Sequence, residues 1–214
     1  MGIVCLFMGT NLLLSYITFR NGTRTLTCPL VFPTIAQTLV PSQPSLRPFD
    51  IAVALRLVLV PEDRYEPLAL ALATSTSAVH RSVARLQHAG ICGAGSRTVL
   101  DSSLHEFLVY GARYAFPAVH GPERTGLPTA GAHPEIATVF GDGEPIRSLV
   151  WPMEGGPARG ETLVPLFNGV TKVAARDGRL HKMLACVDAI RVGSTRQRGT
   201  ASELLQHLIA TRLQ

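Results

Sequence analysis

Cysteine, tryptophan and lysine are scarce in this chain. Its four cysteines, Cys5, Cys28, Cys92 and Cys186, lie far apart and form no C-x-x-C pair, and its seven histidines are scattered without the spacing of metal ligands. Neither a zinc site nor a disulfide framework is therefore expected. We predict reduced cysteines, no metal and no cofactor, a pattern that is typical of a cytoplasmic protein.

Local catalytic motifs are absent as well. The sequence has no G-x-S-x-G, no H-E-x-x-H and no phosphate-binding loop, because the glycine-rich run 155–160 has neither the lysine nor the hydroxyl residue that such a loop needs. We therefore expect no enzyme and no catalytic residues. The alternative is an enzyme with a concave polar pocket under residues 117–160, lined by His133, Asp142 and Glu144.

Only one long hydrophobic run occurs, over residues 3–19, and Asn11 and Ser15 interrupt it. The run is at the lower limit of length for a membrane span, and no positive residue precedes it as in a secretory signal. We expect no membrane partner. Residues 1–45 are interpreted as a poorly specified N-terminal extension, with a segment that packs on the domain or a membrane anchor as the alternatives.

The remaining composition is that of a folded, basic protein. Hydrophobic residues make up 46% and charged residues 16% of the 214 positions, and the net charge is +5. All basic residues except Lys172 and Lys182 are arginines. The planar arginine side chain suits phosphate groups and guanine edges, although a GC-rich genome produces the same bias. A polyanionic partner is compatible with these numbers but does not follow from them.

The stretch 68–91 has the pattern of two helices joined by a turn of three or four residues. The hydroxyl groups of Thr74–Ser77 can cap the second helix, and Gly90 suits the position just past its end. Apolar residues at helical spacing give each helix one inward face, with Leu68, Ala69 and Leu72 in the first helix and Val79, Val83 and Leu86 in the second. We predict a helix-turn-helix whose second helix spans about residues 77–88.

This stretch resembles the winged helix-turn-helix of bacterial transcriptional regulators of the MarR, IclR and GntR type. One departure is Ala73, which stands where the family pattern has the turn glycine. The positions that match the pattern are Leu68, Ala69, Leu72, Ser75, Val79, Arg81, Leu86, Gly90 and Ile91, and Val83 replaces a leucine. The resemblance covers about a quarter of the chain, and it implies a nucleic-acid role without naming an operator or an effector.

A recognition helix of this kind lies in the major groove of DNA, where side chains on its outward face meet bases and phosphates. We expect Ser75, Ser77 and Arg81 near phosphates, or as supports of the helix cap. Base edges are expected to meet Ala78, His80, Arg81 and Arg85. Together with Arg97 on the following wing, the candidate DNA-binding residues are therefore Ser75, Ser77, Ala78, His80, Arg81, Arg85 and Arg97.

Helices and a wing are expected on both sides of this motif. Asp50 is predicted as the N-cap of a helix that Pro61 ends. Two very short strands around the glycine turn 93–96 would form a minimal wing with Arg97 at its tip. A capping box at Ser103 would then start a helix that continues to about Tyr114, and this helix is a candidate dimer contact. The alternative is that the helix only completes the core.

Residues 117–160 are rich in proline and glycine, which argues against a long helix or a central strand there. From Glu161 the helical period returns, first as a short patch at 163–167. Two longer patterns follow, and we predict a C-terminal helical hairpin whose turn near Gly193 carries Arg191, Arg196 and Arg198.

The predicted fold is mainly α, with an extension (1–45), a winged helix-turn-helix domain (46–115), a Gly/Pro-rich segment (116–160) and a C-terminal helical region (161–214). The predicted function is a transcriptional regulator that binds double-stranded DNA, as a homodimer because two half-sites multiply specificity. The alternative is an antitoxin-like or adaptor protein. In that case the C-terminal region would bind a protein partner, and the winged domain would serve autoregulation.

Overall fold

A helix that starts at a proline opens the compact part of the chain. The computed structural model describes residues 15–21, 24–30, 44–61, 64–141 and 147–211. Helix α1 spans Pro48–Leu59, and the Asp50 carboxylate accepts a hydrogen bond from the backbone N–H of Arg47 over 2.8 Å. Proline at the first position costs no hydrogen bond, because the N–H groups of the first turn have no partner within the helix. The helix therefore begins two residues before the predicted N-cap, Asp50.

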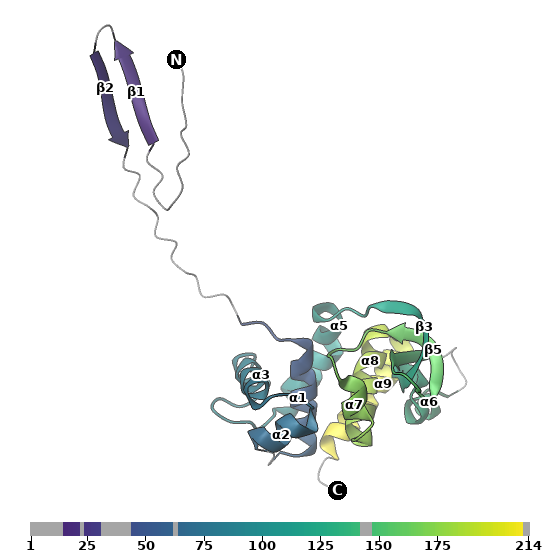
Figure 1. Ribbon diagram of the computed structural model, residues 1–214. Helices are drawn as coiled ribbons and strands as arrows, with labels where there is room; N and C mark the ends of the chain where they lie inside the picture. The colour runs from purple at the N-terminus through teal and green to yellow at the C-terminus, as the bar shows by residue number, and fades with distance from the viewer. Residues whose placement is uncertain (1–14, 22–23, 31–43, 62–63, 142–146, 212–214) are drawn as a thin grey trace. The chain divides into compact units, whose positions relative to one another are not determined.

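The two predicted helices of the helix-turn-helix are present. Helix α2 spans Tyr65–Ala71 and α3 spans Thr76–His88, so that the turn consists of residues 72–75. Ala73 in this turn has φ +50°, the left-handed conformation that its Cβ disfavours. The inward residues Val79, Val83 and Leu86 are buried, as their spacing predicts. Helix α3 packs on α1 and α2 and lies at the edge of the unit, away from the strands β3 (His120–Thr129) and β5 (Ala158–Leu163) and from helix α6 (Pro134–Phe140) (Figure 1).

After α3, the loop of residues 91–100 folds back on itself through one isolated antiparallel bridge between Cys92 and Val99. Gly93 and Thr98 add a backbone hydrogen bond of 3.0 Å, and Gly95 takes φ +66° in the turn. The two short strands predicted for the wing are thus reduced to a single bridge. The shape is a hairpin-like loop next to α3.

A helical segment with a π-helical turn in its middle follows the loop. It consists of α4 (Asp101–Glu106), the π-turn Phe107–Gly111 and α5 (Ala112–Ala115). The start at Asp101 shows that the predicted capping box at Ser103 is wrong, because the leucine at position 100 already takes the N-cap position. The predicted end near Tyr114 agrees with the structure to within one residue.

The Gly/Pro-rich segment contains a small sheet, which the sequence reasoning missed. Strands β3 (His120–Thr129), β4 (Leu149–Pro152) and β5 (Ala158–Leu163) each pair with the other two. The pairs of β3 are antiparallel, for example Leu127 with Trp151 and Arg124 with Gly160, whereas β4 and β5 run parallel.

Prolines and glycines are compatible with these strands for local reasons. The register between β3 and β5 shifts from Gly121 to Glu123, so that Pro122 falls at the irregularity and its missing N–H breaks no regular pair. A Cβ atom at Gly126 would collide with the carbonyl oxygen of Trp151, and one at Gly160 with that of Ser148. The glycines therefore allow the strands to approach closely. Residues 163–167, which we predicted as a helical patch, instead include the end of β5.

Helix α8 (Gly178–Val192) is the centre of the compact unit, and its residues 183–191 are all buried. It contacts α1, β3 and the short helices α6 (Pro134–Phe140) and α7 (Val170–Ala174), besides the 3-10 turn Ala130–Ala132. Helix α9 (Thr195–Ala210) packs against it after a tight turn, with Ser194 as N-cap. The predicted mainly helical fold and the C-terminal pair of helices are confirmed (Figure 1).

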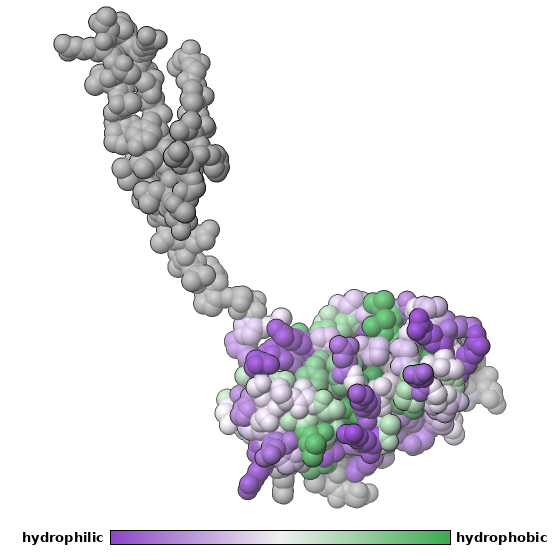
Figure 2. All heavy atoms as spheres, viewed as in Figure 1, coloured by the Kyte–Doolittle hydropathy of each residue, from purple (hydrophilic) through white to green (hydrophobic). Residues whose placement is uncertain are grey.

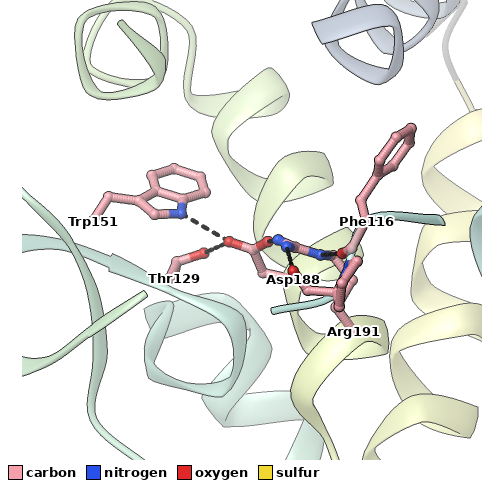
Figure 3. A network of polar contacts seen from close by, with 6 residues as sticks. Phe116, Thr129, Trp151, Asp188 and Arg191 are labelled. Carbon is pink, nitrogen blue, oxygen red and sulfur yellow. Dashed lines mark hydrogen bonds and ion pairs between the residues drawn. The ribbon is translucent and has the colours of Figure 1, made fainter. Parts of the chain in front are cut away.

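A buried ion pair fixes α8 to its surroundings. The Asp188 carboxylate accepts hydrogen bonds from Thr129 Oγ1 (2.9 Å), Trp151 Nε1 (2.8 Å) and Arg191 Nη1 (2.7 Å) (Figure 3). Arg191 also donates to the carbonyl oxygens of Phe116 and Pro117. Burial raises the pKa of Asp188, and the arginine and the two other donors oppose that shift. Arg191 is therefore part of the core and not of the turn in which we had placed it.

Residues Pro44–Gln214 form one compact unit, and Met1–Gln43 form another. Within the second unit, buried residues of α1, α2, α3, α8 and α9 belong to one hydrophobic core. In the first unit, β1 (Ser15–Asn21) and β2 (Arg24–Leu30) pair as an antiparallel hairpin. The rest of the predicted extension lies outside the described residues up to Gln43. Among the helices described, none is long and apolar enough to cross a membrane.

Candidate nucleic-acid interface

The outward face of α3 is open. Six of its residues are exposed, namely Thr76, Ser77, His80, Arg81, Ala84 and His88. Four of them lie along one stripe of the helix, because Ser77, Arg81, Ala84 and His88 are spaced by four, three and four residues. The opposite face is buried against α1 and α2. An exposed stripe on a helix that is held from behind is the arrangement that allows a helix to enter a groove.

Hydroxyl residues form the start of this helix. Ser75 is the N-cap, and its Oγ accepts a hydrogen bond of 3.3 Å from the backbone N–H of Ala78. The Oγ atoms of Ser75 and Ser77 lie 3.2 Å apart. Both serines are exposed and Ala78 is half-buried, so the structure brings these three predicted site residues together at one end of the outward face.

Arg85 differs from the other predicted residues, because it points to the core side of α3. Its Nε and Nη2 atoms donate to the carboxylate of Asp50 on α1 over 2.8 and 2.6 Å. Ser82 donates to the same carboxylate over 2.6 Å. The hydrogen bond with Asp50 raises the pKa of the Arg85 guanidinium above its usual value. We had expected Arg85 to meet base edges; in this structure it joins α3 to α1 instead.

His80 and Arg97 meet at a third side chain, Tyr65 of α2. The rings of His80 and Tyr65 are stacked, with centroids 3.5 Å apart and planes 20° apart. The guanidinium carbon of Arg97 lies 5.0 Å from the centroid of the Tyr65 ring, which is a cation–π geometry. Tyr65 could not be predicted from the sequence, because its contacts join residues 15 and 32 positions apart and follow no local pattern.

The electrostatic character of this region is positive. No aspartate or glutamate occurs in residues 67–100, which contain Arg81, Arg85, Arg97, His80 and His88. Figure 2 shows this end of the unit covered mostly by hydrophilic and intermediate residues, whereas hydrophobic residues reach the surface nearer the middle of the visible face. Arg85 is paired with Asp50, and Glu66 next to Tyr65 is exposed. The positive charge of this surface therefore rests on Arg81 and Arg97. Arginines on an exposed helix face and on the neighbouring loop suit a polyanionic partner.

A pair of histidines, His133 and His181, forms a further polar cluster among the residues described. His133 is buried, its ring lies 4.5 Å from that of His181, and its Nδ1 atom has no hydrogen-bond partner. Burial chiefly lowers the pKa of His133, to about 4. No group of three or more potential metal ligands occurs in the described part of the chain. Asp142 and Glu144, which we had considered with His133, lie outside the described residues.

One open cavity, of about 530 Å³, lies elsewhere, between α1, the end of α2 and the start of α8. Arg56, Arg176 and Arg179 line it together with Asp177, and Asp177 pairs with Arg56 over 2.9 Å. The cavity is therefore separate from residues 117–160, under which an enzyme pocket had been considered.

These features define the protein as a mainly helical one with a small three-stranded sheet and an open, basic helix face. Comparisons with protein-family models, with curated proteins and with solved structures find no match to this chain. The winged helix-turn-helix resemblance therefore stays a prediction, and the functional argument depends on the geometry of α3 and its neighbours.

Proposed function

We propose that this protein binds double-stranded DNA sequence-specifically and regulates transcription, with α3 seated in the major groove. The observation that carries the proposal is the exposed stripe Ser77–Arg81–Ala84–His88 on a helix whose other face is buried. The major groove is about 12 Å wide and admits one α-helix. Arg81 lies in the middle of the stripe, and an arginine there can donate two hydrogen bonds to one guanine.

The support behind α3 strengthens this proposal. A helix that discriminates between bases must be held in a defined orientation. The hydrogen bonds from Ser82 and Arg85 to Asp50 fix the rotation of α3 relative to α1, and the buried Val79, Val83 and Leu86 fix its distance from the core. Any rotation of α3 that buried Arg81 would break the Arg85–Asp50 pair.

In this proposal the loop 91–100 acts as a minimal wing beside α3, with Arg97 toward the DNA backbone. A second copy of the chain would supply the second half-site. Helix segment 101–115 offers the contact for that copy, because Tyr110 and Tyr114 lie four residues apart and are 72% and 76% exposed. Exposed aromatic residues are enriched at protein interfaces.

Those two tyrosines also favour the second candidate function. An adaptor or antitoxin-like protein would use the same aromatic surface to bind a different protein, and α3 would then serve only autoregulation. An adaptor without an autoregulatory role would select no DNA sequence, so the test is whether the isolated protein selects one.

The experiment is a selection of bound duplexes from a random pool with the full chain. We expect an enriched motif that contains guanine, because Arg81 is the central side chain of the stripe. Arg81→Gln should lose enrichment at that guanine, while Arg124→Gln, an exposed arginine on β3, should enrich the same motif as the wild type. Failure of the wild-type protein to enrich any motif would contradict DNA regulation and leave the adaptor function.

A further inference from the structure

Tyr65 touches both elements that the proposed function brings to DNA. Its ring stacks on His80 of α3 at 3.5 Å and lies under the guanidinium of Arg97 at 5.0 Å. Tyr65 itself is half-buried at the first position of α2 and packs against the hydrophobic core. One side chain thus connects α2, α3 and the loop 91–100.

We propose that Tyr65 is a positioning residue, which holds His80 and Arg97 in place so that both bind phosphate groups of the DNA backbone. This inference rests on the proposed function and adds a residue and a role to it. The ligand group is a phosphodiester of the duplex, and the three side chains are called the Tyr65 cluster below.

The loop geometry explains why Arg97 needs such a support. Residues 91–100 are held together by a single bridge between Cys92 and Val99, by backbone hydrogen bonds, and by side-chain hydrogen bonds of Gln87 and Ser96. A long arginine side chain on such a loop loses rotamer entropy when it is fixed. The cation–π contact with Tyr65 restricts the guanidinium before DNA arrives. The planar fork of N–H donors on the guanidinium suits phosphate oxygens.

The position of His80 on α3 points to phosphate and not to a base. With about 3.6 residues per turn, His80 lies about 70° around the helix from the stripe of Ser77, Arg81, Ala84 and His88. When the stripe faces the floor of the groove, His80 is on the flank of the helix that faces α2. The flanks of a groove are formed by the DNA backbone, so a side chain there meets phosphates. We had expected His80 to meet base edges, and we now assign it to the contacts with the DNA backbone.

The salt dependence of DNA affinity distinguishes a residue that contacts a phosphate from one that only supports the structure. Each phosphate that a protein neutralises adds about 0.9 to the slope of log affinity against log salt concentration. A variant that merely unfolds part of the protein lowers the active fraction equally at all salt concentrations and leaves that slope unchanged. A variant that removes a phosphate contact lowers the slope and weakens binding to all sequences alike.

The test is a salt series of fluorescence-anisotropy titrations with the full chain, a selected duplex and a scrambled duplex. We expect Arg97→Gln and Tyr65→Leu each to lower the slope by about 0.9 on both duplexes. Tyr65→Phe keeps the ring and should keep the wild-type slope. Arg124→Gln should also keep it, because Arg124 is an exposed arginine on β3.

Two results would overturn the inference. If Tyr65→Leu binds DNA more weakly but with an unchanged salt slope, Tyr65 only packs against the hydrophobic core and does not position a phosphate contact. An unchanged slope for Arg97→Gln would remove the phosphate contact altogether, and this variant keeps the test decisive if Tyr65→Leu fails to fold. Equal affinity of the wild-type protein for both duplexes would instead count against sequence-specific regulation, while the slopes would still report on the Tyr65 cluster.

Discussion

Arg85 of α3 and Asp50 of α1 form a nearly buried ion pair with two hydrogen bonds, of 2.8 Å at Nε and 2.6 Å at Nη2. The Asp50 side chain is 1% exposed and that of Arg85 is 16% exposed. Asp50 also accepts hydrogen bonds from Ser82 and from the backbone of Arg47. One carboxylate therefore completes the first turn of α1 and fixes the orientation of α3.

Asp50→Ala should lower the free energy of unfolding by about 3–5 kcal/mol, because it leaves the Arg85 charge without its partner. Urea denaturation measures this loss. Glu203→Ala, an exposed acidic residue of α9, is the control and should change stability by less than about 0.5 kcal/mol. The double replacement Asp50→Leu with Arg85→Met should recover most of the loss. A loss below about 1 kcal/mol for Asp50→Ala would show that the pair does not hold the helices.

Ala73→Gly should stabilise the protein by about 0.5–1 kcal/mol. Ala73 has φ +50°, and glycine relieves the strain of its Cβ there, although the unfolded chain gains some freedom from the glycine. Ala84→Gly, at an exposed position inside α3, is the matched control, and it should destabilise by about 1 kcal/mol. Thermal unfolding of both variants measures the difference, and a lower stability of Ala73→Gly than of the wild type would contradict the strain.

The stability should fall on acidification because of His133. Its pKa in the folded protein is lowered from 6.5 to about 4, chiefly by burial. Between these two pH values the unfolded chain binds a proton at His133 and the folded chain does not. The contribution of the neutral His133 to the free energy of unfolding is therefore fully present above pH 6.5 and decreases until about pH 4. Between pH 7 and 5 the histidine should account for about 2 kcal/mol of the loss.

Urea denaturation at the two pH values, for the wild type and His133→Gln, checks this expectation. The variant should lose less stability than the wild type, and His207→Gln, an exposed histidine of α9, should lose as much as the wild type. Burial also lowers the pKa of His181, whose ring contacts His133, so both proteins keep a second histidine whose pKa burial lowers. Identical pH dependence of His133→Gln and the wild type would show that His133 is accessible to protons in the folded state.

Local patterns predicted the elements that depend on near neighbours. The spacing of Val79, Val83 and Leu86 places α3 within one residue of its observed start and at its observed end, and Ser75 is the N-cap that the hydroxyl residues indicate. The two C-terminal helices follow from their own periods. The order of elements from α1 to the loop 91–100 was therefore accessible from sequence.

Contacts between distant residues account for what the sequence did not reveal. Strand β3 contains two prolines, and two of its residues, Arg124 and Gly126, pair with Gly160 of β5 and Pro152 of β4, so no propensity indicated a strand. The sequence placed Arg191 in a turn, because nothing in it indicated the hydrogen bonds that this side chain donates to Asp188, Phe116 and Pro117. In the candidate site, Arg85 looked like a reader of bases because Asp50 lies 35 positions away.

The most direct test of the account is a titration of the wild-type chain and Arg81→Gln with the selected duplex and a scrambled duplex at one salt concentration. We predict that the wild type binds the selected duplex at least about 1,000-fold more tightly than the scrambled one. Arg81→Gln should lose about 1–3 kcal/mol of that preference. Equal affinity of the wild type for both duplexes, or an unchanged preference in Arg81→Gln, would contradict base reading by α3.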